Sequence, residues 1–208
     1  MEITNSNLKK SILPLRDMDF CVIIKYNEKG IENMTDIKFD RKWATPNKNT
    51  FSIKPICELV DRYLDKLDYR DIVLDPFAGS SPFKSFCITN DLDPEINANF
   101  HVDATDFLAK FSCEVDLVLY DPPYSPRQVS EVYKKLGKTV NMQTTQSSYW
   151  TKHKKLISKI VRKNGFVITC GWNSGGIGKT NGFEIIEILL VPHGGWHNDT
   201  IVTVERKL

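Results

Sequence analysis

Apolar residues gather in short runs, separated by polar turns and by stretches with helical spacing. Runs rich in β-branched and aliphatic residues predict buried parallel strands ending at residues 75, 90, 103, 120 and 170. The stretches between them predict helices: 55–64, a helix through residue 85 after the turn 76–82, one near 95–99, and others at 104–109 and 151–163. This alternation predicts an α/β fold with a mostly parallel, doubly wound sheet.

The two ends of the chain depart from this rhythm. Residues 183–191 and 200–205 are apolar runs with no helix between them, so we expect an antiparallel C-terminal hairpin. Residues 20–26 read as a strand with a partner near 37–39. We therefore divide the chain into a small N-terminal β extension or arm, residues 1–48, and a main domain, residues 49–208.

Composition narrows the class of protein. The chain has 208 residues, 41% hydrophobic and 26% charged, as in one globular domain with a sizeable core. Its five cysteines form no CxxC pair, which favours reduced thiols in the cytoplasm. No leader pattern or long apolar window is present, so secretion and membrane spanning are not expected. A net charge of +2 neither indicates nor excludes a nucleic-acid partner.

Acidic residues stand at or beside four predicted strand ends: Asp75, Asp91, Asp103 and Asp121. Carboxyl ends of parallel strands meet at one sheet edge, which is where ligands bind in open α/β sheets. Four acids in succession there predict a site, although solvated strand ends are the simpler alternative.

The turn from Asp75 to Ser80, with sequence DPFAGS, lets a ligand approach the backbone closely. It contains only Gly79 of the three glycines of a dinucleotide fingerprint, and it has no cation for a pyrophosphate. A ligand ammonium group paired with Asp75 fits better. Asp91 suits ribose hydroxyls, and Asp103 suits the exocyclic amine of an adenine. Together these acids predict a nucleoside that carries positive charge.

Two motifs resemble those of a known family. Asp75-Pro76-Phe77-Ala78-Gly79 and Asp121-Pro122-Pro123-Tyr124 resemble the cofactor and catalytic motifs of S-adenosylmethionine-dependent amino methyltransferases of DNA, in particular the adenine-N6 type. The segment 51–55 resembles a further cofactor-contacting motif of that family. The resemblance covers residues 49–206 and implies a Rossmann-like, seven-stranded sheet. It also implies a cofactor site formed by Phe51, Lys54, Pro55, Asp75, Pro76, Phe77, Gly79, Asp91 and Asp103.

The residue types of the segment 121–124 suit this chemistry independently. An exocyclic amine on adenine is a poor nucleophile because its lone pair is delocalised into the ring. Asp121 and the carbonyl of Pro122 can accept its two hydrogens, and Pro122 and Pro123 hold these acceptors rigid. Tyr124 can stack on a base swung out of a duplex. The plainer alternative is a strand-ending turn with a packed aromatic ring.

Substrate contacts are expected from cations and aromatic rings outside these motifs. Tyr149 and Trp150 open a lysine-rich helix, which could follow a phosphate backbone or be a solvated face. Arg127 lies in the polar stretch 125–148. Lys179 ends a segment similar to a phosphate-binding loop, but a strand follows instead of the required helix, so we expect Lys179 to contact a substrate phosphate or solvent.

The four histidines do not predict a metal site. His193 and His197 are separated by two glycines and have no third ligand, so hydrogen-bonded or solvated roles are expected.

These features predict transfer of a methyl group from S-adenosylmethionine to adenine N6 in DNA, single-stranded or with the base flipped. Such an enzyme could work with a nuclease in restriction and modification. The chain has no room for a large target-recognition domain. Methylation of an amine in RNA or protein therefore stays open, as does a cofactor-binding subunit that needs a separate recognition partner.

Overall fold

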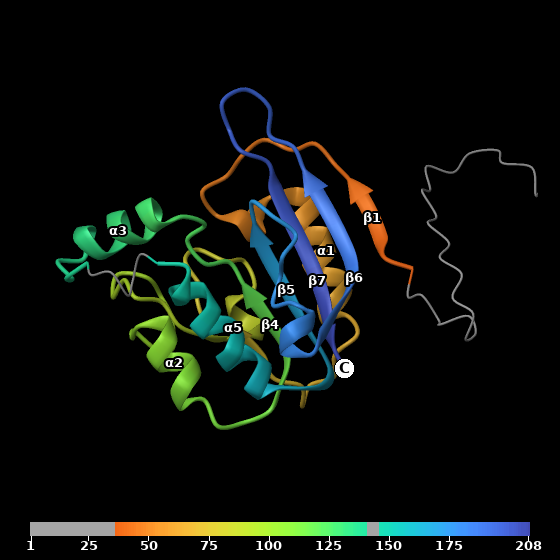
Figure 1. Cartoon of the computed structure of the whole chain (residues 1–208), viewed down its shortest axis with the longest axis horizontal. Helices are drawn as coiled ribbons and strands as arrows, with labels where there is room; N and C mark the ends of the chain where they lie inside the picture. Colours follow the sequence, from red (N-terminus) through yellow and green to blue (C-terminus); the bar gives the residue numbers. More distant parts are fainter. Residues whose placement is uncertain (1–35, 141–145) are drawn as a thin grey trace, which may run out of the picture. The chain divides into compact units, whose positions relative to one another are not determined.

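A computed structural model describes residues 36–140 and 146–208. Within them one sheet has seven strands in the order β1-β6-β7-β5-β4-β2-β3 (Figure 1). The strands are β1 (Lys38–Arg41), β2 (Val73–Asp75), β3 (Ile88–Thr89), β4 (Val115–Tyr120), β5 (Val161–Gly171), β6 (Phe183–Val191) and β7 (Thr200–Lys207). Only β7 runs antiparallel to its neighbours. The predicted Rossmann-like, mostly parallel sheet and the C-terminal hairpin are confirmed.

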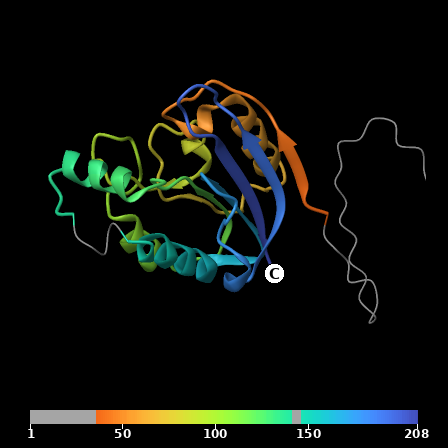
Figure 2. The same ribbon diagram turned by 45° about the horizontal axis from the view of Figure 1, so that its top comes forward.

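Helices cover both faces of the sheet, as a doubly wound fold requires (Figure 2). They are α1 (Lys54–Leu64), α2 (Ala104–Lys110), α3 (Pro126–Lys135) and α5 (Ser148–Ile160), with short 3-10 turns η1 (Thr50–Ser52), η2 (Lys84–Phe86) and η3 (Lys179–Asn181). Helix α1 shares a core with one face of β4, and α2 and α5 share a second core with the other face. No helix in the described part of the chain is long and apolar enough to cross a membrane.

Strand β4 is buried at every position. Leu117 and Leu119 face the α1 core, whereas Val118 and Tyr120 face the α2 and α5 core. This two-sided burial explains why its sequence is apolar except for the buried Asp116, with no regular polar alternation.

The segment between β2 and α2 is less regular than its sequence predicts. The helix expected through residue 85 and the helix near 95–99 are both wrong: the structure has only the short turn η2 and bends there. The strand predicted to end at residue 103 is reduced to a single bridge between Asn90 and Phe100. Side-chain oxygens take backbone amides that regular helix or sheet hydrogen bonds would otherwise use. Asp93 accepts from the Glu95 amide, and Asn99 accepts from the Thr89 amide.

Part of the polar stretch 125–148 is a helix, α3. Ser125 caps α3 by accepting from the Gln128 amide at 3.3 Å, and Pro126 occupies the first turn. This start signal was missed because the apolar positions that follow it are few. The strand expected at residues 20–26 lies outside the described residues. Its expected partner forms as β1, but pairs in parallel with β6 of the main sheet.

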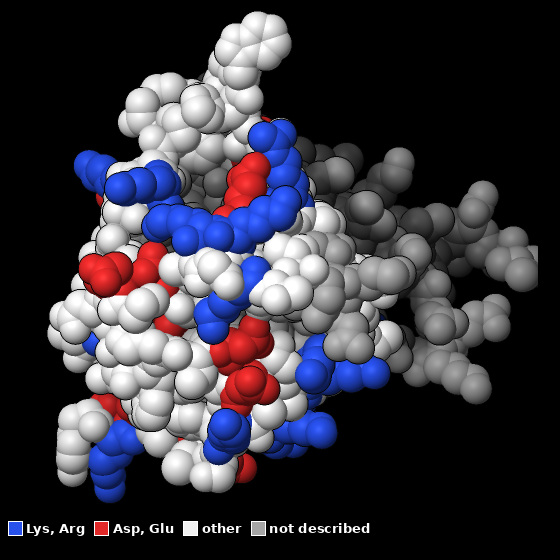
Figure 3. Space-filling model, turned by 90° about the vertical axis from the view of Figure 1, so that its left-hand side faces the viewer, with Lys and Arg blue, Asp and Glu red and all other residues white. Residues whose placement is uncertain are grey.

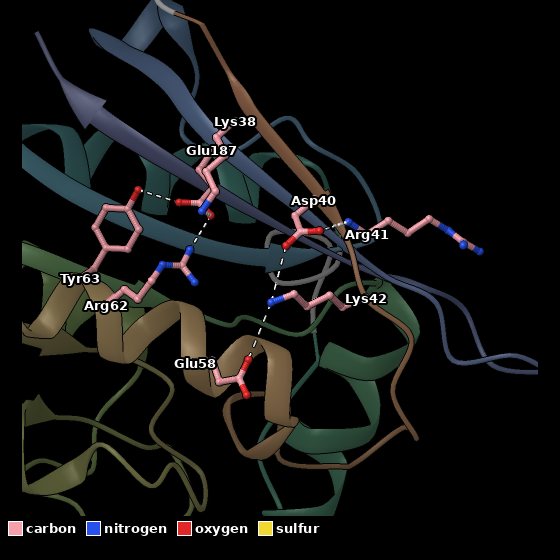
Figure 4. A network of polar contacts seen from close by, with 8 residues as sticks. All are labelled: Lys38, Asp40, Arg41, Lys42, Glu58, Arg62, Tyr63 and Glu187. Carbon is pink, nitrogen blue, oxygen red and sulfur yellow. Dashed lines mark hydrogen bonds and ion pairs between the residues drawn. The ribbon is translucent and has the colours of Figure 1, made fainter. Parts of the chain in front are cut away.

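Edge strand β1 is held by a polar network around Glu187 (Figure 4). The Glu187 carboxylate, 5% exposed, accepts from Lys38 Nζ at 2.9 Å and from the Tyr63 hydroxyl at 3.0 Å, and it also pairs with Arg62. Burial opposes ionisation of Glu187, but these donors outweigh it and lower the pKa of the carboxyl. One carboxylate thus joins β1, β6 and α1.

We expect Glu187→Ala to lower the free energy of unfolding by about 2 kcal/mol, because it leaves the buried Tyr63 hydroxyl without its acceptor and removes the shared partner of Lys38 and Arg62. Urea denaturation measures this. The control is Glu131→Ala, which removes an exposed pair with Arg127 and should cost about 0.5 kcal/mol. Equal losses in the two variants would contradict the role of Glu187.

Candidate active site

The carboxyl ends of the central strands open into a cavity of about 410 Å³. Asp91, Asp103 and Asp121 all line it, so the structure brings together three of the four predicted acids. Lys48 is the one cationic side chain in this lining, beside these acids and Glu131. The cavity therefore favours a ligand with positive charge.

Asp91 shapes the turn that follows β2. Its Oδ2 accepts from the Gly79 amide at 2.8 Å, and its Oδ1 accepts from the Asp93 amide at 2.8 Å. Gly79 has φ +45°, a left-handed conformation that favours glycine. The small-residue turn and the acid of the next strand thus form one rigid wall of the cavity.

Asp103 and helix α3 close the opposite side. Asp103 caps α2 by accepting from the Thr105 amide at 2.8 Å, and it accepts from the Tyr133 hydroxyl of α3. Burial would raise the pKa of Asp103, but these hydrogen bonds outweigh it and lower that pKa. Asp103 is therefore ionised at neutral pH, with both oxygens already engaged.

Asp75 is the most deeply buried of the four acids. Its Oδ1 accepts from the Phe77 amide at 3.1 Å, and its Oδ2 is buried without a hydrogen-bond partner. Burial raises the pKa of Asp75 to about 8, and the nearby charges of Asp121 and Asp91 add to this. Asp75 is therefore mostly protonated at neutral pH, and a cation bound nearby would favour its ionised form.

Asp121 and Tyr124 interact directly at the end of β4. The Tyr124 hydroxyl donates to Asp121 Oδ1 and lies 3.3 Å from the Thr50 hydroxyl. Burial raises the pKa of Asp121, which makes it a better proton acceptor. The acid is thereby oriented by the aromatic residue three positions later.

Two hydrogen bonds from other elements fix the backbone of this segment. Trp150 Nε1 in α5 donates to the Pro123 carbonyl at 2.8 Å. The Tyr124 amide donates to Gln128 Oε1 in α3 at 2.6 Å. Trp150, predicted as a substrate contact, thus also positions the segment 121–124.

A second cavity of about 460 Å³ lies on the other side of this segment. Pro122 and Tyr124 line both cavities and so separate them. Trp150 and Trp172 line the second cavity, and the Trp172 ring meets Tyr124 edge-on with centroids 5.7 Å apart. Thr169, whose buried hydroxyl has no hydrogen-bond partner, also lines it.

The predicted site residues fall into three groups, and Trp150 lines only the second cavity. Those lining the first cavity are Phe51, Pro76, Phe77, Gly79, Asp91, Asp103, Asp121, Pro122, Pro123, Tyr124 and Tyr149. Those lining neither cavity are Lys54, Pro55, Asp75, Arg127 and Lys179. The roles of the residues in all these groups stay predictions.

Sequence reasoning missed several lining residues: Lys48, Thr50, Gln128, Glu131, Val132, Tyr133, Lys154, Thr169 and Trp172. The members in α3 could have been found from the Ser125-Pro126 helix start, because Gln128, Glu131 and Val132 follow at helical spacing.

The loop that resembles a phosphate-binding loop cradles a carboxylate of the chain itself. Both oxygens of the buried Glu205 accept backbone amides, from Ile177 and from Gly178. Gly176 has φ +46°, and a Cβ there would collide with the Glu205 carboxylate. The glycines therefore serve this internal contact.

Two histidines are buried and hydrogen-bonded. His193 donates through Nδ1 to the Ala44 carbonyl at 2.9 Å, and its Nε2 lies 2.8 Å from the Thr200 hydroxyl. In α5, His153 lies between the Thr105 and Tyr120 hydroxyls, at 3.0 and 3.1 Å. The expectation of hydrogen-bonded histidines is confirmed for this pair.

The sequence matches no protein-family model and no curated protein. Solved structures do resemble its fold. TrmN from Thermus thermophilus is 19% identical with a TM-score of 0.50, and the match covers 75% of this chain and 49% of TrmN. The candidate methyltransferase yhhF from Escherichia coli is 12% identical with a TM-score of 0.51, covering 79% of this chain and 91% of yhhF. This likeness shows the Rossmann-like α/β fold.

We expect stability to depend on His153 between neutral and mildly acidic pH. Burial lowers the pKa of His153 to about 4, so the unfolded state binds more protons between that value and 6.5. Stability therefore falls as the pH is lowered through this window. From about pH 7 to about pH 5, His153 alone should account for a loss of about 2 kcal/mol.

The measurement is urea denaturation at both pH values for the wild type and His153→Gln. The change in unfolding free energy between the two pH values is compared for the two proteins. Carboxylates that titrate in both contribute equally and cancel in this comparison. The exposed His101, changed to Gln, is the control and should keep the pH dependence of the wild type. Identical pH dependence in all three proteins would contradict the prediction.

Proposed function

We propose that this protein transfers a methyl group from S-adenosylmethionine to an amine of a nucleobase, with N6 of adenine in DNA as the preferred target. One observation carries the proposal. The segment 121–124, an acid followed by two prolines and a tyrosine, separates an acid-rich cavity from an aromatic one. Such a wall can present a cofactor and an amine to each other from its two sides.

The chemistry of the first cavity fits the cofactor. S-adenosylmethionine carries an ammonium and a sulfonium group, and it supplies an electrophilic methyl group when bound. Asp91 would meet the ribose hydroxyls and Asp103 the adenine amine. Asp75 is buried outside the cavity lining, next to Pro76, and would act on the ammonium group through its charge once that cation favours the ionised form. Phe51 and Phe77 add apolar walls. The fold shared with the candidate methyltransferase yhhF adds support.

Residues of the segment 121–124 would activate the amine. Asp121 and the Pro122 carbonyl accept its two hydrogens, which directs the nitrogen lone pair out of the ring system. The two prolines, with Trp150 and Gln128 as anchors, keep these acceptors from rearranging. When nitrogen becomes positive on alkylation, Asp121 is the base that takes the proton, which its raised pKa favours.

The second cavity favours a planar substrate. Tyr124, Trp150 and Trp172 are aromatic rings that can enclose a heterocycle removed from its stack. Lys154 lines the same cavity, and Lys152 and Lys155 are exposed on the same helix, where phosphates can be met. RNA offers the same base, so an RNA amine is the second candidate; a separate recognition subunit is compatible with both.

Label transfer should identify the substrate and the methylated atom together. We expect methyl-tritiated S-adenosylmethionine to label DNA, and nucleoside digestion to place the label in N6-methyldeoxyadenosine. RNA and protein are offered in parallel as acceptors. Label found only in protein would contradict nucleobase chemistry, and label found only in RNA would move the proposal to the second candidate.

Variants should separate catalysis from cofactor binding. We expect Asp121→Ala to reduce transfer by about a hundredfold or more, while calorimetry finds cofactor affinity within severalfold of the wild type. Asp91→Ala should weaken cofactor binding because it removes a contact to the ribose, and Asp75→Asn should weaken it because it removes a carboxyl that the bound cation would ionise. Transfer that survives in Asp121→Ala would sink the mechanism.

A further inference from the structure

The connection between β6 and β7, residues 192–199, projects beyond the sheet (Figure 1). At its tip Trp196 is fully exposed, and Trp43, in the segment that follows β1, is 65% exposed. Single exposed apolar side chains are common, but two neighbouring indoles on an ordered support indicate a contact surface.

The support is well defined by hydrogen bonds. The Lys42 amide donates to the Leu190 carbonyl at 3.0 Å, and the Ala44 amide donates to the Pro192 carbonyl at 3.2 Å. His193 ties the same two segments together through the Ala44 carbonyl. Trp43 lies against Gly194, where an added Cβ would be 3.6 Å from its Nε1. Both indoles are therefore carried by one structural unit.

This unit lies at the same end of the sheet as the two cavities, the end at which the parallel strands have their carboxyl termini. Strands β1, β4 and β6 run in the same direction, and their carboxyl ends lead into Trp43, Asp121 and the projecting connection. Lys48, which lines the first cavity, follows Trp43 by five residues. A chain of that length spans at most about 18 Å, so Trp43 lies within the length of a few nucleotides from the lining of the first cavity.

We propose that Trp43 and Trp196 form a stacking platform for the bases of a single-stranded nucleic acid that flank the target base. This inference rests on the proposed function, because it names the kind of strand that the site takes. Aromatic faces stack on any base, which would give affinity without a large recognition domain.

Charge on the adjoining surface agrees with a nucleic-acid partner. Figure 3 shows Lys and Arg side chains in a band across the face that carries α3, with Asp and Glu side chains beside and below it. Exposed cations on and after α3 are Arg127, Lys134, Lys135 and Lys138, and Lys48 is exposed beside the first cavity. A protein partner would need a broader apolar surface than two indoles provide, whereas phosphates and bases match cations and rings.

The test is fluorescence anisotropy of a short, labelled single-stranded oligonucleotide that contains adenine, offered as DNA and as RNA. We expect Trp43→Ala and Trp196→Ala each to weaken binding by roughly five- to a hundredfold. The dependence of affinity on salt should keep its slope, because neutral rings release no counterions. Affinity for the same sequence as a blunt duplex should change little, since its bases are already stacked.

Tyr69→Ala is the matched control, since Tyr69 is 91% exposed and lies before β2, at the opposite sheet edge. Cofactor binding reports that each variant is folded. Single-strand affinity unchanged in both tryptophan variants, or lowered equally by Tyr69→Ala, would overturn the platform. Methyl transfer by the wild type is measured separately. Intact transfer with no effect of the tryptophan variants would show that the platform is wrong. Loss of single-strand affinity in those variants without any transfer by the wild type would show that the proposed function is wrong.

Discussion

Burial of β4 on both faces is the constraint on which the rest of the structure depends. Its six residues have no exposed side, so helices must pack against both faces of the sheet. The strand then ends at Asp121 and two prolines, which cannot continue it. A packed core therefore delivers an acid and a rigid backbone to the sheet edge where the other strands also end.

Charge at that edge is left uncompensated within the described residues that line the cavity. Three carboxylates and Glu131 face one lysine, and Asp75 lies buried beside them with an oxygen that has no partner. Leaving the Asp75 oxygen without a partner costs folding free energy, and so does gathering acids around one lysine, so the arrangement is better explained by a ligand than by stability. By contrast, Glu187 and Glu205 are buried acids whose donors come from the chain itself. These two acids support the fold, whereas the acids at the cavity gather negative charge around one lysine, and Asp75 beside them keeps an oxygen without a partner.

Helices outside the central sheet complete the site. Helix α3 brings Tyr133 to Asp103 and Gln128 to the Tyr124 amide, and α5 brings Trp150 to the Pro123 carbonyl. The wall between the two cavities is thus held by two helices, α3 and α5. Preorganisation of this kind is what amine activation needs, because acceptors that move with the substrate lower the barrier less.

The sequence by itself determined the elements whose signal is local. The apolar run of β4, the spacing of α1 and the helix-free C-terminal hairpin were all predicted, and so was the meeting of acids from different strands at one edge. Predictions failed where local side-chain hydrogen bonds displaced helix, at 95–99, and where few apolar positions concealed α3.

Tertiary structure alone decided which groups meet across long stretches of chain. Thr50 reaches Tyr124, Trp150 reaches Pro123, and a loop that resembles a phosphate cradle encloses Glu205. No periodicity encodes such pairs, because each depends on how whole elements pack. For the same reason the segment 121–124 could be identified from its residues, whereas its place as the wall between two cavities could be seen only in the folded chain.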